Sequence, residues 1–144
     1  MHPEYANGSE LPLPAVVRLY DAVGWRAYTD NPQQLAAALA GSTLVAVVRD
    51  GDELAGLARV ISDGHSICYL QDVLVDPKYQ RTGLGRDLVQ YVLAPYAQVR
   101  QKVLLTDTEP GQKAFYESLG YRQAGDGGGE TGGLPLRAFV RFDT

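Results

Sequence analysis

Two glycines and two arginines lie close together between residues 80 and 86 of this chain of 144 residues. Gly83 and Gly85 have no Cβ atom, so the backbone there can approach a ligand closely. Arg81 and Arg86 add positive charge, and the helix expected to follow presents unpaired N–H groups and the positive end of its dipole. These residues predict a turn that binds phosphate, and a pyrophosphate group would suit it.

The spacing of this turn differs from that of the two common nucleotide-binding loops. It lacks the Gly-Lys-Ser/Thr ending of a Walker loop, and it lacks the third glycine and the downstream acid of a dinucleotide fingerprint. Taken alone, the two glycines favour an ordinary turn between a strand and a helix.

With its flanks, the turn resembles the acyl-coenzyme A loop of the GNAT superfamily of N-acetyltransferases, in which Arg/Gln-x-x-Gly-x-Gly/Ala follows a strand ending in Val-x-Pro. This chain has Val-Asp-Pro at 75–77 and Gln-Arg-Thr-Gly-Leu-Gly at 80–85. Residues 115–121 resemble the family's Phe-Tyr-x-x-x-Gly-Phe/Tyr motif, in which a short helix ends at a glycine C-cap. The two motifs occur in the family's order and separation.

The resemblance implies acetyl-coenzyme A (acetyl-CoA) as cosubstrate, no metal, and an enzyme that transfers the acetyl group to the primary amine of a small molecule. Transfer to a protein N-terminus or a lysine is an alternative. A non-catalytic acyl-CoA sensor module is another, and so is a relative of the same fold whose loop binds a different phosphate ligand. Amine acetylation needs a deprotonated amine, a polarised thioester carbonyl and a proton donor for the leaving thiolate.

The resemblance also implies which residues bind acetyl-CoA. The thioester and the pantetheine arm would use main-chain groups of Val73, Leu74 and Val75, at the end of a central strand. The next strand, near Val103, is expected to diverge so that these groups stay open. The pyrophosphate would bind to the turn itself, through Gln80, Arg81, Thr82, Gly83, Leu84, Gly85 and Arg86.

Tyr116 in the second motif is implied as the general acid. A phenol, with a pKa near ~10, stays protonated at neutral pH and can protonate a leaving thiolate. The alternative is a core tyrosine on an amphipathic helix, the role expected of its neighbour Phe115.

No residue is evident as the general base. In the resembled family the base lies on the face of the central strand toward the acceptor. Here that face would hold Tyr69 and Gln71, and neither is a carboxylate or an imidazole. Asp72 would point to the opposite face unless a β-bulge intervenes, and Asp107 follows the next strand. Both acids are expected to be structural, so a water relay or an amine that arrives neutral is an equal alternative to a dedicated base.

The candidate residues for binding the acceptor have aromatic or polar side chains that suit an ammonium or an arylalkylamine. Core roles for Tyr20 and Trp25 are an equal alternative. The candidates are Tyr20, Trp25, Tyr28, Tyr69, Gln71 and Asp107.

Apolar periodicity predicts the elements that position these residues. Helices are expected at 14–23, 33–40, 84–94 and 112–119, and Asn31-Pro32 provides the N-cap and first residue of the second helix. Strands are expected at 43–49, 53–61, 66–75 and 103–106, with a hairpin at Asp50-Gly51. Further strands are expected at 121–123 and 137–142. Residues 1–12 read as an arm or first strand, and the glycine-rich loop 125–133 has no assignable chemistry.

These elements predict an α/β (α+β) fold with a GNAT-like mixed, mostly antiparallel sheet of six to seven strands. Helices flank the sheet on both sides, and its parallel central strands splay apart. The whole chain, 1–144, is expected to form a single acetyltransferase domain.

Composition and charge limit the partners and the location. With 45% apolar and 21% charged residues and no long apolar run, the chain reads as soluble, cytoplasmic and without a membrane partner. The formal charge of −4 argues against nucleic acid as the main partner. The single cysteine, Cys68, is expected in the core, and no Cys/His cluster indicates a metal. A homodimer is left open.

Overall fold

The computed structural model of this chain describes residues 1–126 and 133–143. The chain divides into two compact units, Met1–Leu105 and Thr106–Thr144. In the described residues, the first unit contains five strands and four α-helices, and the second contains one α-helix.

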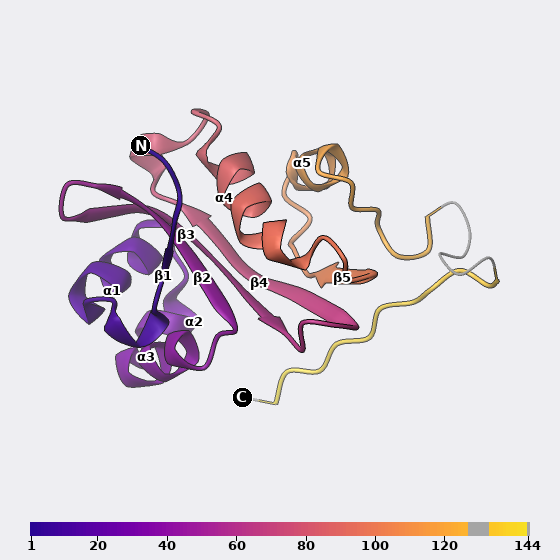
Figure 1. Cartoon of the computed structure of the whole chain (residues 1–144), viewed down its shortest axis with the longest axis horizontal. Coiled ribbons are helices and arrows are strands. Elements are labelled where there is room, and N and C mark those ends of the chain that lie inside the picture. The colour runs from indigo at the N-terminus through magenta and orange to yellow at the C-terminus, as the bar shows by residue number, and fades with distance from the viewer. Residues whose placement is uncertain (127–132, 144) are drawn as a thin grey trace. The chain divides into compact units, whose positions relative to one another are not determined.

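The first unit is built on a mixed sheet with the strand order β1-β2-β3-β4-β5 (Figure 1). Neighbouring strands are antiparallel except β4 and β5, which are parallel. The predicted hairpin joins β2 to β3 at Gly51, whose φ of 62° is left-handed as such a turn requires. The strands are β1 (Glu4–Ala6), β2 (Leu44–Asp50), β3 (Glu53–Ser62), β4 (Ile67–Val75) and β5 (Gln101–Leu104).

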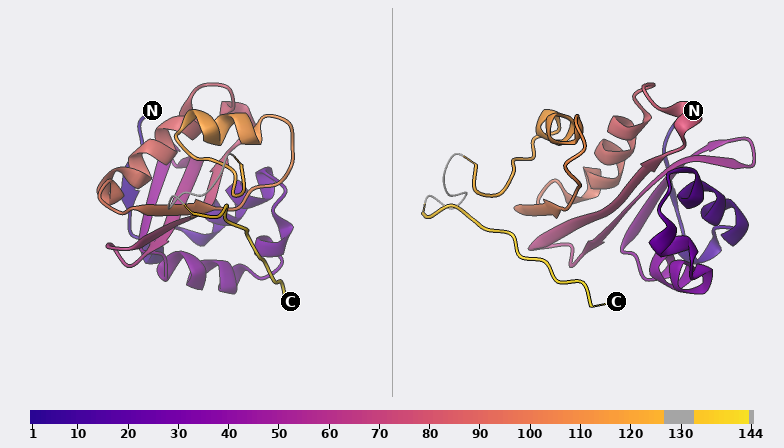
Figure 2. Two further views of the ribbon diagram at one scale, coloured as in Figure 1. Left: turned by 90° about the vertical axis from the view of Figure 1, so that its right-hand side faces the viewer. Right: turned by 180° about the vertical axis from the view of Figure 1, so that it is seen from behind.

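Helices cover both faces of this sheet, as predicted (Figure 2). On one face lie α1 (Leu13–Ala22), α2 (Arg26–Thr29) and α3 (Pro32–Ala40). Leu19 of α1 and Leu39 of α3 are buried there against Val47 and Leu57 of the sheet. On the other face lies α4 (Leu84–Leu93), which follows the short 3-10 helix η2 (Pro77–Tyr79).

Helix α4 packs closely against the sheet because Gly56 of β3 has no side chain. A Cβ atom at Gly56 would lie 2.8 Å from Leu88 Cδ1 and 3.1 Å from the Leu74 carbonyl oxygen. The buried residues of α4 are Leu84, Leu88, Val89 and Val92. This packing sets where the first turn of α4 lies relative to the end of β4.

The local signals for helix ends are confirmed. Asn31 caps α3, with its side chain accepting the Gln34 N–H at 3.2 Å, and Pro32 is the first residue of that helix. Short 3-10 turns at Gly8–Glu10 (η1) and Ala94–Tyr96 (η3) flank α1 and α4. No helix of the described ranges is both long and apolar enough to cross a membrane.

The second unit contains α5 (Gln112–Ser118), which ends in a Schellman motif. The Gly120 N–H donates to the Glu117 carbonyl at 3.0 Å, and the Tyr121 N–H donates to the Tyr116 carbonyl at 3.0 Å. The φ of Gly120 is 96°, a left-handed value that glycine adopts without strain. The glycine end predicted for this helix is therefore confirmed.

The predicted number of strands is wrong for the described residues, because the sheet has five strands where six to seven were expected. Residues 121–123 and 137–142 form no strand. A strand exists only when its backbone pairs with a neighbour, and the alternation of side chains does not specify that neighbour. Most of the glycine-rich stretch 125–133 lies outside the described residues.

Candidate functional site

Strands β4 and β5 separate halfway along β4. Their pairing begins at Ile67 and Gln101 and ends at Leu70 and Leu104. β4 continues to Val75 with only β3 assigned as its strand partner in the described part of the chain. The predicted loss of pairing between these two strands is confirmed, and from Gln71 to Val75 β4 has no strand partner on the side of β5 among the described residues.

A β-bulge lies where the two strands separate. Arg59 of β3 pairs with Asp72 and Val60 pairs with Leu70, so Gln71 has no opposite residue. Tyr69 pairs with Ile61, two residues from Arg59, and Asp72 therefore shares a sheet face with Tyr69. This is the face covered by α1, α2 and α3. Because of this bulge, Asp72 does not point to the face opposite Tyr69, as it would in a regular strand.

Asp72 is the centre of a buried polar cluster on this face. The side chains of Asp72 and Arg59 are 3% and 7% exposed, and Arg59 Nε donates to Asp72 Oδ2 at 2.6 Å. The Tyr20 hydroxyl donates to the same oxygen at 2.9 Å, and the Tyr28 hydroxyl donates to Oδ1 at 2.8 Å. Three donors occupy this carboxylate, so we assign it a structural role.

Three aromatic rings pack beside this cluster. Tyr20 and Tyr28 meet edge to face at 5.1 Å between ring centroids, and Trp25 lies 6.0 Å and 6.2 Å from them. Tyr20 is fully buried, so its side chain does not touch a bound acceptor directly. Tyr28 is partly buried, and Gln71 Nε2 donates to its hydroxyl oxygen at 3.1 Å.

Burial raises the pKa of Tyr20, and the charge of Asp72 raises it further. Burial also raises the pKa of Tyr28, and the hydrogen bond from Gln71 offsets this only in part. The pKa of Tyr69 is raised by burial and then by the charge of Asp72. The three phenols therefore keep their protons at neutral pH.

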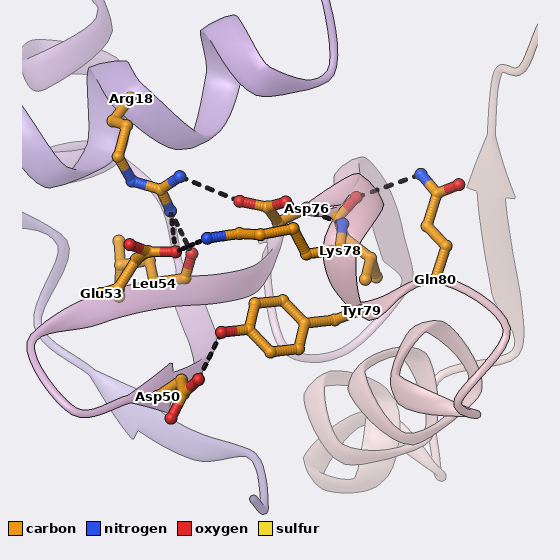
Figure 3. A network of polar contacts seen from close by, with 9 residues as sticks. Arg18, Asp50, Glu53, Leu54, Asp76, Lys78, Tyr79 and Gln80 are labelled. Atoms are coloured by element: carbon orange, nitrogen blue, oxygen red, sulfur yellow. Dashed lines mark hydrogen bonds and ion pairs between the residues drawn. The ribbon is translucent and has the colours of Figure 1, made fainter.

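A network of charged residues supports the turn after β4 (Figure 3). Arg18 donates to Asp76 Oδ2 at 2.9 Å and to the Leu54 carbonyl at 2.7 Å. Asp76 also accepts the Lys78 N–H at 2.9 Å, which caps η2. Burial alone would raise the pKa of Asp76, but the hydrogen bonds from Arg18 and the Lys78 N–H outweigh it and lower that pKa. Asp76 and Pro77 are thus held in place directly before residues 80–86, which we term the glycine turn.

The backbone of the glycine turn is left-handed at two positions. Gly83 is the N-cap of α4 with φ 87°, and no side chain caps this helix. Arg81, with φ 64°, is the one described residue other than glycine in the left-handed region. Such backbone outliers cluster at ligand-binding turns. The four residues from Gln80 to Gly83 are exposed, and Gly85 and Arg86 lie in the first turn of α4.

Gln80 joins this turn to the open end of β4. Its Nε2 donates to the Val75 carbonyl at 3.2 Å (Figure 3). The Val75 carbonyl therefore points to the turn and accepts from a side chain. Val73 and Val75 are partly buried, whereas Leu74 is buried on the face of α1 and α3.

In the second unit, Tyr116 is partly buried between two aromatic neighbours. Its ring lies 5.0 Å from Phe115 and 6.0 Å from Tyr121, edge to face with both. Burial raises the pKa of Tyr116, and the negative charge of Asp107 raises it further. Asp107 is exposed and accepts the Glu109 N–H at 3.0 Å, as expected of an acid that caps a turn.

Arg59 and the cluster around Asp72 were not predicted from the sequence. A signal was present, since Arg59 and Asp72 are charged residues in the interior of two neighbouring, largely apolar strands. Such isolated charges in neighbouring strands predict a buried ion pair. The short helix α2, which carries Tyr28, was missed as well.

Comparison with known families matches residues 19–136 to a model described as the acetyltransferase (GNAT) domain. The match includes the glycine turn, the splayed strands and the motif around Tyr116. The chain belongs to the GNAT acetyltransferase family.

Similar proteins carry acetyltransferase names. A histone acetyltransferase from Glycine max is 31% identical over 85% of this chain and 57% of its own length. A chloroplastic GCN5-related N-acetyltransferase from Arabidopsis thaliana is also 31% identical, over 85% of this chain and 55% of its own. The chain thus spans little more than half of these two relatives. A solved GNAT-family structure from Streptococcus pneumoniae TIGR4 has a TM-score of 0.71 at 31% identity, covering 83% of this chain and 86% of its own.

Proposed function

We propose that this chain transfers an acetyl group from acetyl-CoA to the primary amine of a small molecule. The observation that carries the proposal is the separation of β4 from β5 after Leu70 and Leu104. It leaves a strand edge open directly before a turn that leads into the N-terminus of α4, which no side chain caps. An extended, amide-containing arm attached to a pyrophosphate matches these two adjoining surfaces.

The residues at both surfaces fit this ligand. Main-chain groups of Val73, Leu74 and Val75 pair with the pantetheine arm. The Val75 carbonyl already accepts from the Gln80 amide at 3.2 Å, so a ligand N–H can take that place. Backbone N–H groups of the glycine turn, together with Gln80, Thr82 and the two arginines, bind the pyrophosphate.

When bound, acetyl-CoA supplies the acetyl group and a thiolate leaving group. Tyr116 keeps its proton because burial and then Asp107 raise its pKa, and it donates that proton to the departing sulfur. We assign no carboxylate as the general base, because Asp72 is occupied by three donors and Asp107 caps a turn. The amine is deprotonated by water or arrives neutral.

A protein amine is the second candidate acceptor. It is favoured by the name of the Glycine max relative, a histone acetyltransferase 31% identical to this chain. The relatives are longer than this chain, so residues that recognise a protein substrate in them need not have a counterpart here.

Two assays test the proposal. Acetyl-CoA should raise the Tm of the protein, whereas ATP and NAD at equal concentration should not. Thiol release from acetyl-CoA should then depend on an amine, in a panel of polyamines, arylalkylamines, amino sugars and a lysine-rich peptide. Stabilisation by acetyl-CoA without thiol release in any member of the panel would indicate a sensor module. Faster release with the peptide than with every small amine would indicate a protein acceptor.

A further inference from the structure

A chain of hydrogen bonds runs from the buried Arg59–Asp72 ion pair to the exposed side chain of Gln71. Arg59 Nε donates to Asp72 Oδ2 at 2.6 Å, and Asp72 Oδ1 accepts the Tyr28 hydroxyl at 2.8 Å. Gln71 Nε2 donates to the Tyr28 oxygen at 3.1 Å. These four residues form what we term the β4 relay.

The charge at the buried end of the relay sets the direction of every hydrogen bond in it. A carboxylate paired with a guanidinium has no proton, so it can only accept. The phenol has one proton, which it donates to Asp72, and its oxygen is then left as an acceptor for Gln71. The amide of Gln71 must therefore turn its NH₂ group toward Tyr28. The opposite orientation would place two oxygens together with no proton between them.

This constraint leaves Gln71 Oε1 directed away from Tyr28. No donor to this oxygen is assigned among residues 1–126 and 133–143, and Gln71 is exposed. Gln71 is also the extra residue of the bulge, directly after the last β4–β5 pair, Leu70 and Leu104. An oriented hydrogen-bond acceptor thus lies at the start of the open strand edge.

We propose that Gln71 Oε1 accepts an N–H of the acceptor amine and aligns it for acetyl transfer, with Tyr28 as the positioning residue that holds the amide. This inference rests on the proposed function and adds the residue that selects an amine with a free N–H. Trp25 lies 6.2 Å from Tyr28 between ring centroids and so packs near the ring that holds this amide.

A neutral amide suits this task better than a carboxylate would. A carboxylate next to the amine would stabilise its protonated form, which has no lone pair for attack. An amide oxygen aligns an N–H without holding the positive charge as strongly. The acceptor predicted for this site is a primary amine bound close to its neutral, reactive form.

The test compares Gln71→Met with the parent in steady-state kinetics, using the best amine of the panel. Methionine keeps the length of the side chain and removes both amide groups. The KM for the amine should rise by roughly 3- to 10-fold, the range for one lost hydrogen bond, while the KM for acetyl-CoA stays within about 2-fold. Gln90→Met, at an exposed position of α4, is the matched control and should leave both constants unchanged.

Tyr28→Phe provides a second readout that a purely structural role would not produce. It keeps the ring but removes the oxygen that holds the amide, so the KM for the amine should rise in this variant too. Combining it with Gln71→Met should add nothing further, because both changes break the same relay. Additive effects, or a parental KM for the amine in Gln71→Met, would overturn the inference while leaving an active acetyltransferase. A parent without amine-dependent thiol release would overturn the proposed function as well.

Discussion

Arg59 and Asp72 form an ion pair at 2.6 Å across two neighbouring strands, with side chains 7% and 3% exposed. The pair lies beside the β-bulge in which Gln71 is the extra residue, so it fixes the register of β3 and β4 where the candidate site begins. Removing one partner would leave the other charge buried without compensation, which is strongly destabilising.

Asp72→Asn should therefore lower the free energy of unfolding by about 3–5 kcal/mol, measured by urea denaturation. The matched control is Glu4→Gln, which breaks the exposed pair between Arg49 and Glu4, whose side chains are 39% and 55% exposed. That change should cost less than about 1 kcal/mol. Equal losses in the two variants would contradict the assignment of Asp72 to a buried, compensated site.

Gly83→Ala should remove the stabilisation by acetyl-CoA while the protein stays folded. The φ of Gly83 is 87°, and a Cβ there meets no protein atom within 4 Å, so it would project into space that the phosphate needs. The left-handed backbone should cost about 1–2 kcal/mol. The matched control is Gly51→Ala in the β2–β3 hairpin. The φ of Gly51 is 62°, and a Cβ atom there also meets nothing within 4 Å.

This pair of variants separates strain from binding. Both should lose similar stability without ligand, but only Gly83→Ala should lose the rise in Tm on adding acetyl-CoA. If the two variants kept equal thermal shifts, the glycine turn would not bind the cosubstrate.

Tyr116→Phe should reduce kcat by roughly 10²-fold or more, the usual scale for a positioned general acid. Acetyl-CoA affinity should hardly change, because the ring and its packing against Phe115 and Tyr121 remain. Tyr5→Phe, at an exposed tyrosine of β1, is the control. Turnover within a few-fold of the parent would assign Tyr116 to the core of its unit, and loss of acetyl-CoA binding would make its hydroxyl a binding group.

Asp76 should contribute a stability that depends on pH. Its pKa in the folded protein is lowered, whereas an unfolded aspartate titrates near ~3.9. Its contribution is thus complete above that value and is lost as the pH falls through the lower, folded pKa. Asp76→Asn should flatten the acid side of a plot of unfolding free energy against pH. An unchanged slope below about pH 4 would show that other carboxylates determine the acid transition.

The sequence by itself determined the elements whose signals are local. Pro32 and Asn31 begin α3, Gly51 turns the β2–β3 hairpin, and Gly120 ends α5. In each case the deciding interaction lies within a few residues, so the identity of the residue is enough. The glycine turn before α4 belongs to this group too, although its interpretation as an acyl-CoA loop came from a family resemblance.

Only the tertiary structure decided how separate strands meet. The bulge at Gln71 arises from the pairing of Arg59 with Asp72, and the sequence pattern of β4 alone would put Asp72 on the other face. The four-residue helix that carries Tyr28 could be identified only in the structure, where Tyr28 donates a hydrogen bond to Asp72. For the same reason the expected strands at 121–123 and 137–142 are absent from the described residues, because a strand needs a partner that its own residues do not specify.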